Sequence, residues 1–197
     1  CRTSALGGHI DACDECGNVS ISYNSCRNRH CPKCQGRNRE QWIENRETEL
    51  LPVPYFHVVF TLPEVLNNTA LHEPKMLYDT LFETAWETLQ TFGKNKNLQM
   101  GMIAVLHTWG QNLSLHPHLH CIVPGGGVDE NGAWKNIKND GKFLFSVKAL
   151  SKVFRAKFCE KLKANLKDKF NENQENEYEK IRQSLWEKPW VVYAKKP

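Results

Sequence analysis

The sequence LHPHLHCIV at Leu115–Val123 decides the fold of the larger part of the chain. Side chains alternate between the two faces of a strand, so every second residue of this stretch shares a face. One set is apolar and is expected to enter a core, which leaves the other set on the opposite face. The apolar set is Leu119, Cys121 and Val123, and the other set is His116, His118 and His120.

His118 and His120 are therefore candidate ligands of one divalent ion and candidate catalytic residues. Imidazoles that are neighbours on one face can bind a cation through nitrogen and leave positions open for water and a phosphate oxygen. A third ligand could come from His107 or His57, and the sequence does not choose between them. The alternative is an exposed histidine-rich strand that binds nothing.

The segments around this strand predict an antiparallel sheet with flanking helices, which is an α+β fold. Runs rich in apolar residues at 55–62 and 101–109 predict two more strands, and turn residues at 110–112 predict a hairpin. The glycine run that follows Pro124 is expected to end the histidine strand. Leucines at helical spacing over 77–89 predict one helix.

A second helix is predicted from about Val147 to Phe170, with Ser146 as its cap. Its apolar residues recur every four positions and predict a buried stripe. It carries eight basic residues against two acidic ones. This excess is consistent with a DNA-contacting face or with a solvated face, and the sequence leaves both open.

Six of the eight cysteines lie in the first 34 residues. Cys13 with Cys16 and Cys31 with Cys34 form two CxxC pairs, 14 residues apart, which is close to the spacing of a four-cysteine zinc site. We interpret this as a zinc ribbon in a reducing cytoplasm, since no signal-peptide pattern precedes it. Paired disulfides are the alternative.

A second set of metal ligands is available in the same region. Cys26 and His30 form a CxxxH, and Cys1 with His9 would complete four ligands. A module of this size cannot bury a self-sufficient core, so the zinc would be structural. A short helix is expected over 40–50, and prolines at 52 and 54 indicate a linker. We therefore predict a zinc module at 1–50 and a second domain at 51–197.

Basic residues concentrate between Cys26 and Arg39, a segment with no acidic residue. The formal net charge is only +4, so DNA binding must be argued from this local cluster. Guanidinium groups on a metal-stabilised scaffold suit contact with phosphate oxygens, whereas the alternative is a solvated basic loop. The candidate DNA-binding residues are Arg27, Arg29, Lys33, Arg37 and Arg39.

The composition is that of an ordinary globular protein, with 40% hydrophobic and 24% charged residues. No run of 18 uncharged apolar residues occurs, so we expect no transmembrane segment and no membrane partner.

His118-Leu119-His120 resembles the histidine–hydrophobic–histidine signature of HUH nucleases. The longer stretch HTWGQNLSLHPHLHCIVPGGG at 107–127 resembles rolling-circle transposases of the insertion sequence 91 family. Three further segments resemble that family, namely YNSCRNRHCPKCQ at Tyr23–Gln35, FHVVFTLP at Phe56–Pro63 and WVVYAKKP at Trp190–Pro197. The resemblance covers nearly the whole chain.

The resemblance implies an N-terminal transposase zinc-binding domain followed by an HUH nuclease domain. It implies Mg²⁺ or Mn²⁺ as the catalytic ion at His118 and His120, next to a phosphate of single-stranded DNA at the element end. A tyrosine would attack that phosphate and form a 5′-phosphotyrosine link. The expected location is the bacterial cytoplasm, in association with the nucleoid.

The nucleophile is where this chain departs from the family pattern. The family's paired tyrosines are expected just beyond the WVVYAK-like segment, whereas the tyrosines here form no close pair at helical spacing. They are Tyr23, Tyr55, Tyr78, Tyr178 and Tyr193. We expect the chain to bind metal and DNA without nicking by itself. The other classes left open are a non-catalytic zinc-dependent DNA-binding protein and a metal-dependent hydrolase that uses activated water.

Overall fold

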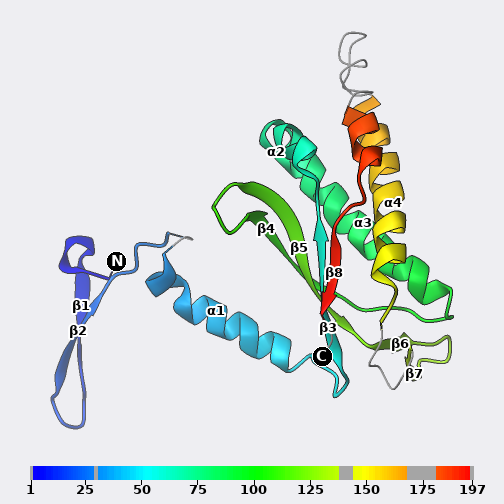
Figure 1. The fold of residues 1–197 in the computed structure, drawn as a ribbon. Helices are drawn as coiled ribbons and strands as arrows, with labels where there is room; N and C mark the ends of the chain where they lie inside the picture. The colour runs from blue at the N-terminus through cyan, green and yellow to red at the C-terminus, as the bar shows by residue number, and fades with distance from the viewer. Residues whose placement is uncertain (1, 29–30, 138–143, 168–180, 196–197) are drawn as a thin grey trace. The chain divides into compact units, whose positions relative to one another are not determined.

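The structure is a computed structural model that describes residues 2–28, 31–137, 144–167 and 181–195 (Figure 1). The chain forms two compact units, Cys1–Pro52 and Val53–Pro197. Helices and antiparallel strands make up both units, which confirms the predicted α+β class. No helix in the described ranges has the length and apolarity needed to cross a lipid bilayer.

The first unit is a β-hairpin followed by a helix. A short 3-10 turn, Ser4–Leu6, precedes β1 (Gly8–Ala12) and β2 (Val19–Tyr23), which pair antiparallel. The helix α1 spans Pro32–Glu47, so it begins well before the short helix expected over 40–50. Proline at its first position is already restricted to a helical φ, and the Cys31 side chain caps the helix, which explains the earlier start.

The second unit is built on a four-stranded sheet in the order β4-β5-β3-β8. All of its strand pairs are antiparallel, and the central pair joins β3 to β5 along seven residue pairs. The strands at 55–62, 101–109 and 115–123 are confirmed, and so is the hairpin that joins the last two. The bounds are β3 Tyr55–Thr61, β4 Ile103–Trp109, β5 Leu115–Pro124 and β8 Val192–Lys195.

Two long helices cover one face of this sheet, α3 (Pro74–Lys94) and α4 (Val147–Lys167) (Figure 1). A 3-10 turn, Glu64–Leu66, and the short helix α2 (Asn67–His72) lead from β3 into α3. The opposite sheet face carries none of these helices. The predicted second helix is thus confirmed as far as Lys167, and residues 168–170 lie outside the described ranges.

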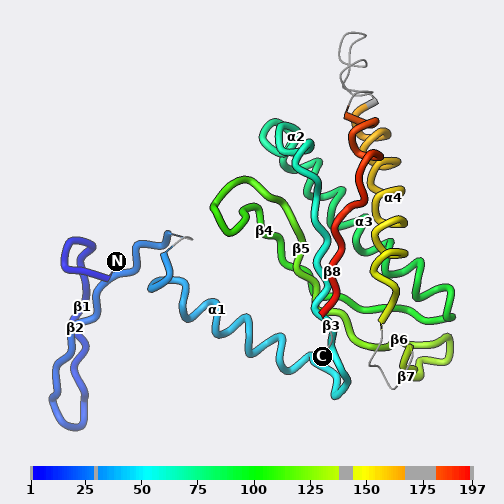
Figure 2. The backbone as a smooth tube through the Cα atoms, viewed as in Figure 1, coloured from blue at the N-terminus to red at the C-terminus, as the bar shows by residue number. Residues whose placement is uncertain are grey.

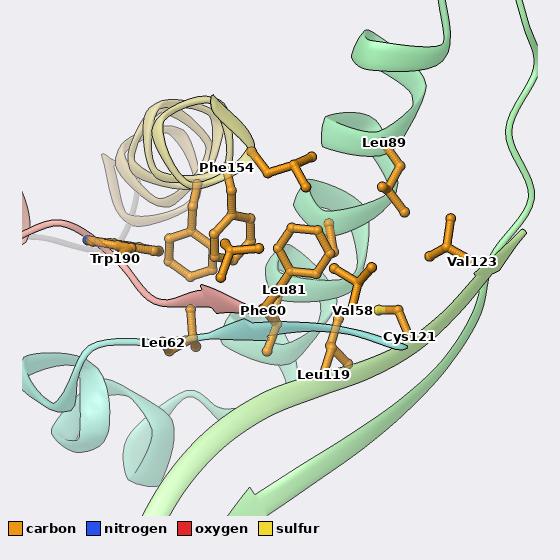
Figure 3. Packing of buried hydrophobic residues seen from close by; sticks show 14 of the residues in the cluster. Val58, Phe60, Leu62, Leu81, Leu89, Leu119, Cys121, Val123, Phe154 and Trp190 are labelled. Carbon is orange, nitrogen blue, oxygen red and sulfur yellow. The ribbon is translucent and has the colours of Figure 1, made fainter. Parts of the chain in front are cut away.

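The core lies between the helices and the sheet, as Figure 3 shows. Phe154 of α4 sits at its centre, with its ring centroid 4.9 Å from that of Phe60 and 5.4 Å from that of Trp190. The every-fourth apolar stripe of α4 is buried, and so is the apolar set of β5, as the sequence predicted. These residues are Leu150, Phe154, Phe158, Leu162 and Leu166 on α4, and Leu119, Cys121 and Val123 on β5.

The histidine strand β5 ends at Pro124, as the glycine run predicted, and after Gly125 the chain enters a second small sheet. Strand β6 (Gly126–Val128) pairs with β7 (Trp134–Asn136). A Cβ atom on Gly126 would lie 2.4 Å from the Lys135 carbonyl oxygen. Glycine is therefore required at this position by the close approach of the neighbouring strand.

The basic residues of α4 serve partly structural purposes. Lys161 lies 2.9 Å from a carboxylate oxygen of Glu87 and 3.1 Å from one of Glu83, both on α3. Arg155 donates to the Lys188 carbonyl oxygen at 3.2 Å and lies over the Trp186 ring. These contacts give Lys161 and Arg155 partners within the second unit. They therefore favour a structural role for these two residues over contact with DNA.

Candidate metal and nucleic-acid site

The histidines of β5 lie on the sheet face that the long helices leave open. The register places His118 opposite His107 of β4, and His120 opposite Val105. Ligand nitrogens of His107, His118 and His120 all lie within 4.8 Å of one another. Three imidazoles from two adjacent strands can therefore face one cation.

Hydrogen bonds orient the two β5 rings. His118 Nδ1 lies 2.6 Å from the His116 carbonyl oxygen, so Nδ1 carries the proton and Nε2 keeps a free lone pair. His120 Nδ1 lies 2.7 Å from His57 Nε2, which comes from β3 on the other side of β5. Each ring thus has one nitrogen held by the protein and the other available as a ligand, as is usual for metal-binding histidines.

The cluster favours neutral imidazoles. Burial, reinforced by neighbouring imidazoles, lowers the pKa of His107 and of His120 below the ordinary value of 6.5. Only the neutral ring can donate a lone pair to a metal. The protonation state near pH 7 therefore fits a divalent ion at this position.

The sequence left His107 and His57 as alternatives for the third metal ligand. In the structure, His107 lies with His118 and His120. His57 contacts His120 instead and is not part of the three-histidine group. The β3–β5 register places His57 near His120, and no local sequence pattern specifies that register. The assignment of His107 as the third ligand remains a prediction.

The cluster opens into a hollow with a volume of about 720 Å³. Its walls come from the ends of β4 and β5 and from the loop between them, and they include Trp109, Gln111 and Asn112. None of the lining residues that the structure describes is acidic. Hydrogen-bonding and imidazole groups without negative charge suit an anionic ligand.

In the first unit, Cys26, Cys31 and Cys34 form a second candidate metal group, with sulfurs within 4.8 Å of one another. The Cys34 backbone N–H donates to Cys31 Sγ at 3.4 Å, at the N-terminus of α1. Hydrogen bonds from the Ser25 side chain and the Cys26 backbone lower the pKa of the Cys34 thiol to about 6. Such a thiol is largely thiolate at neutral pH, which is the form that binds zinc.

The other predicted zinc ligands lie elsewhere or outside the described residues. Cys13 and Cys16 occupy the turn between β1 and β2, whereas the chain leaves the hairpin toward α1 from its opposite end (Figure 2). Neither Cys13 nor Cys16 belongs to the group of Cys26, Cys31 and Cys34, so the four-cysteine ribbon stays a prediction. His9 contacts Asp11. Cys1 and His30 are outside the described residues.

All seven cysteines in the described ranges are free thiols. The disulfide alternative is therefore not the state of this structure. Cys121 and Cys159 are buried in the second unit, where burial raises the pKa of both thiols, to about 12 and about 11. Those two cysteines act as core residues.

The candidate DNA-binding residues of the first unit are exposed where they are described. Lys33 and Arg37 are one helical turn apart on α1 and share a face, and Arg39 points to the other side of the helix. Arg27 has a left-handed backbone, with φ of 54°. Arg29 lies outside the described residues.

Among the described tyrosines, Tyr193 lies on the open sheet face. It pairs with Val59 of β3, which in turn pairs with His120, so the three share one row across the sheet. The Tyr193 side chain is 52% exposed. Tyr78 belongs to α3, which covers the other sheet face, and Tyr178 is outside the described residues.

Comparisons with known proteins identify both parts of the chain. A family model described as "Transposase zinc-binding domain" matches residues 1–62, and one described as "Putative transposase" matches residues 101–197. The "Putative transposase y4qJ" of Sinorhizobium fredii is 45% identical over 208 residues, which include the whole of this chain. The chain belongs to the insertion sequence 91 family of transposases.

A second relative of this chain is the transposase for insertion sequence element IS801 of Pseudomonas savastanoi pv. phaseolicola. It is 38% identical over 139 residues, which cover 70% of this chain and 34% of the relative. The S. fredii match covers 52% of that protein. The chain thus spans about half the length of one curated relative and matches about a third of the other.

Among solved structures, this chain is similar to the conjugative relaxase TrwC in complex with a mutant OriT DNA. The identity is 14%, the TM-score is 0.42, and the match covers 55% of this chain and 44% of the relaxase chain. A metal-bound structure of TrwC with OriT DNA gives 13% identity and a TM-score of 0.38, and covers 55% and 43% of the two chains. The family assignment rests on the sequence matches.

Sequence reasoning identified His118 and His120 but missed how His57 and Trp109 relate to them. Strand alternation could have shown that His57 lies on the opposite face of β3 from the buried apolar residues. The contact of His57 with His120, however, depends on the pairing of β3 with β5. Trp109 follows His107 by two residues, and this spacing was the one available signal for its position beside the cluster.

Proposed function

We propose that this chain is the metal-binding and DNA-binding part of a transposase that nicks single-stranded DNA at the ends of its mobile element. The observation that carries the proposal is the group of His107, His118 and His120, which lines a hollow whose described lining residues include no carboxylate. In the alternative, a non-catalytic zinc-dependent DNA-binding protein, this second cluster has no role.

The three histidines would hold Mg²⁺ or Mn²⁺, which supplies Lewis-acid stabilisation of the negative charge that gathers on phosphate oxygens. His116 and His57 hold the Nδ1 atoms of His118 and His120, so both rings keep a fixed orientation and tautomer. Imidazole ligands also accept zinc, so the choice of Mg²⁺ or Mn²⁺ comes from the family likeness.

In the whole protein, a tyrosine oxygen would attack the scissile phosphorus. The bond from that oxygen to phosphorus forms, the bond from phosphorus to the 3′ oxygen breaks, and the tyrosine gives up its proton while the 3′ oxygen gains one. The product is a 5′-phosphotyrosine with a free 3′-hydroxyl, and the phosphodiester is conserved for strand transfer. We propose that this chain does not supply that tyrosine.

The first unit would be a zinc-stabilised contact for DNA phosphates. The sulfurs of Cys26, Cys31 and Cys34 supply three ligands, and His30 is the predicted residue nearest to them in sequence. The exposed basic residues from Arg27 to Arg39 would contact the backbone of element-end DNA. We place the intact protein in the bacterial cytoplasm, at the nucleoid.

The experiment that tests the metal site is calorimetric titration of the zinc-loaded chain with Mn²⁺. We expect one Mn²⁺ site in the wild type and none in H118A or H120A. His72 is an exposed histidine on α2 that contacts the Asn68 carbonyl oxygen, so H72A is the matched control and should bind Mn²⁺ like the wild type. Unchanged binding in H118A and H120A would favour the non-catalytic alternative.

A second assay tests the chemistry. A single-stranded oligonucleotide labelled at its 3′ end is incubated with the chain and Mn²⁺, then separated from the protein on a denaturing gel. We expect no label attached to the protein. A covalent adduct would contradict the missing nucleophile, and its loss in Y193F would assign the attack to Tyr193. Cleavage without an adduct would indicate a hydrolase that uses activated water.

A further inference from the structure

Trp109 is a large aromatic residue that the fold leaves half in solvent. Its side chain is 51% exposed, although tryptophan is usually well covered in soluble proteins. The ring is nearly parallel to that of His107, with an interplanar angle of 11° and a centroid distance of 5.1 Å. Because His107 covers one face of the indole, the accessible surface includes the opposite face.

This exposed ring belongs to the same hollow as the histidine cluster. Trp109 and the three clustered histidines all line it. Two residues along a strand advance by about 6.6 Å, so a ligand stacked on Trp109 can place a neighbouring group at the cluster. A nucleotide has this combination of a flat ring and an adjacent anionic group.

The loop after Trp109 is held rigidly beside the hollow. The Gly110 N–H donates to the Ser114 carbonyl oxygen at 2.9 Å, and the Leu113 N–H donates to the Gly110 carbonyl oxygen at 3.0 Å. Leu113 has a φ of 63° and is 82% exposed. Leu113 thus has a left-handed backbone, which residues with a Cβ rarely adopt, and presents an apolar side chain to solvent.

We propose that Trp109 is a stacking platform for a base of single-stranded DNA. The inference rests on the proposed function, in which the histidine cluster faces a phosphate of the same strand. Aromatic side chains stack on any base, because every base has a π-face. Bases in a duplex are already stacked, so the platform selects single strands and not a particular sequence.

The test is fluorescence anisotropy of the full chain with labelled oligothymidylate, in the presence of Mn²⁺. The second ligand is an oligomer of equal length that has the sugar–phosphate backbone but no bases. W109A should bind oligothymidylate about 10- to 100-fold more weakly than the wild type and bind the abasic oligomer equally well. W109F should retain most of the affinity, because phenylalanine also stacks.

Trp86 of α3 provides a matched control, since it is 38% exposed and belongs to the helix layer on the other sheet face. W86A should bind both oligomers like the wild type. Equal binding of oligothymidylate by W109A and the wild type would overturn the proposal. So would an equal loss for both oligomers, which would indicate a distorted loop and not a lost base contact.

Failure of the inference can be separated from failure of the proposed function. If the wild type binds Mn²⁺ but W109A keeps full affinity for oligothymidylate, only the stacking platform is wrong. If H120A retains Mn²⁺ binding while W109A loses base-dependent affinity, the metal site is wrong and the stacking platform stands.

Discussion

Removal of the His57 imidazole should weaken metal binding at the histidine cluster without removing a ligand. His57 Nε2 lies 2.7 Å from His120 Nδ1, and the two rings are nearly parallel, at 10°. This contact holds His120 Nδ1 and leaves Nε2 for the cation. In H57A the ring of His120 loses that restraint and can rotate or change tautomer.

The size of the effect follows from the contact that is lost. A hydrogen bond between neutral partners contributes about 1 to 1.5 kcal/mol, which corresponds to roughly tenfold in an equilibrium constant. His118 keeps its bond to the His116 carbonyl oxygen, so only one of the ligands is affected. We therefore expect a loss of about tenfold in Mn²⁺ affinity, at the lower end of the 10- to 100-fold range typical of residues that orient metal ligands.

The assay is calorimetric titration of Mn²⁺ into the wild type, H57A and H57Q. Glutamine can accept a hydrogen bond through its side-chain oxygen, so H57Q should recover part of the lost affinity. A complete loss of the site in H57A would mean that His57 is itself a ligand. Affinity equal to that of the wild type would refute the idea that the contact orients His120.

Three further predictions concern pH, zinc and the core. The pKa values of His107 and His120 are lowered in the folded chain, so the unfolded chain binds more protons just below pH 6.5. The free energy of unfolding, measured in urea, should therefore fall as the pH drops from 6.5 toward those lowered values. The fall should be less steep in a variant with glutamine at both positions. C34S should lose the zinc measured by atomic absorption, whereas C13S should keep the zinc of the Cys26 group. Loss of zinc in both variants would instead favour the four-cysteine ribbon. F154A should lower the free energy of unfolding by about 3 to 5 kcal/mol, because Phe154 is fully buried, and a loss under 1 kcal/mol would contradict the described core.

The strands and helices of the second unit could be predicted from sequence because their patterns are local. Alternation along Leu115–Val123 separates the buried apolar set from the histidines, and the four-residue repeat of α4 marks its buried stripe. The pairing of β3 between β5 and β8 could not be predicted, because it joins segments far apart in the chain. His57 reaches His120 only through that pairing.

The first unit shows a different difficulty. CxxC spacing predicts which cysteines lie in the same turn, but it does not predict which turns lie close together in the folded chain. Cys13 and Cys16 lie in the turn between β1 and β2 and are not part of the group that Cys31 and Cys34 form at the start of α1. Cys26, which the sequence assigned to a second set, instead lies with Cys31 and Cys34.

The division of the sheet into two faces makes the histidine site experimentally separable from the fold. Along β5, Leu119 and Cys121 have no exposed surface. His118 precedes Leu119 and His120 lies between the two, and both histidines are on the opposite, open face of the sheet. Substitution of the histidines therefore removes contacts on the open face, such as that of His120 with His57, and leaves the packing of Leu119 and Cys121 in place. A loss of metal or DNA binding in H118A, H120A or W109A can then be attributed to the site, provided that the urea midpoint of the variant stays near that of the wild type. A large drop in that midpoint would instead show that the open face contributes to the fold, and the separation of the two faces would fail.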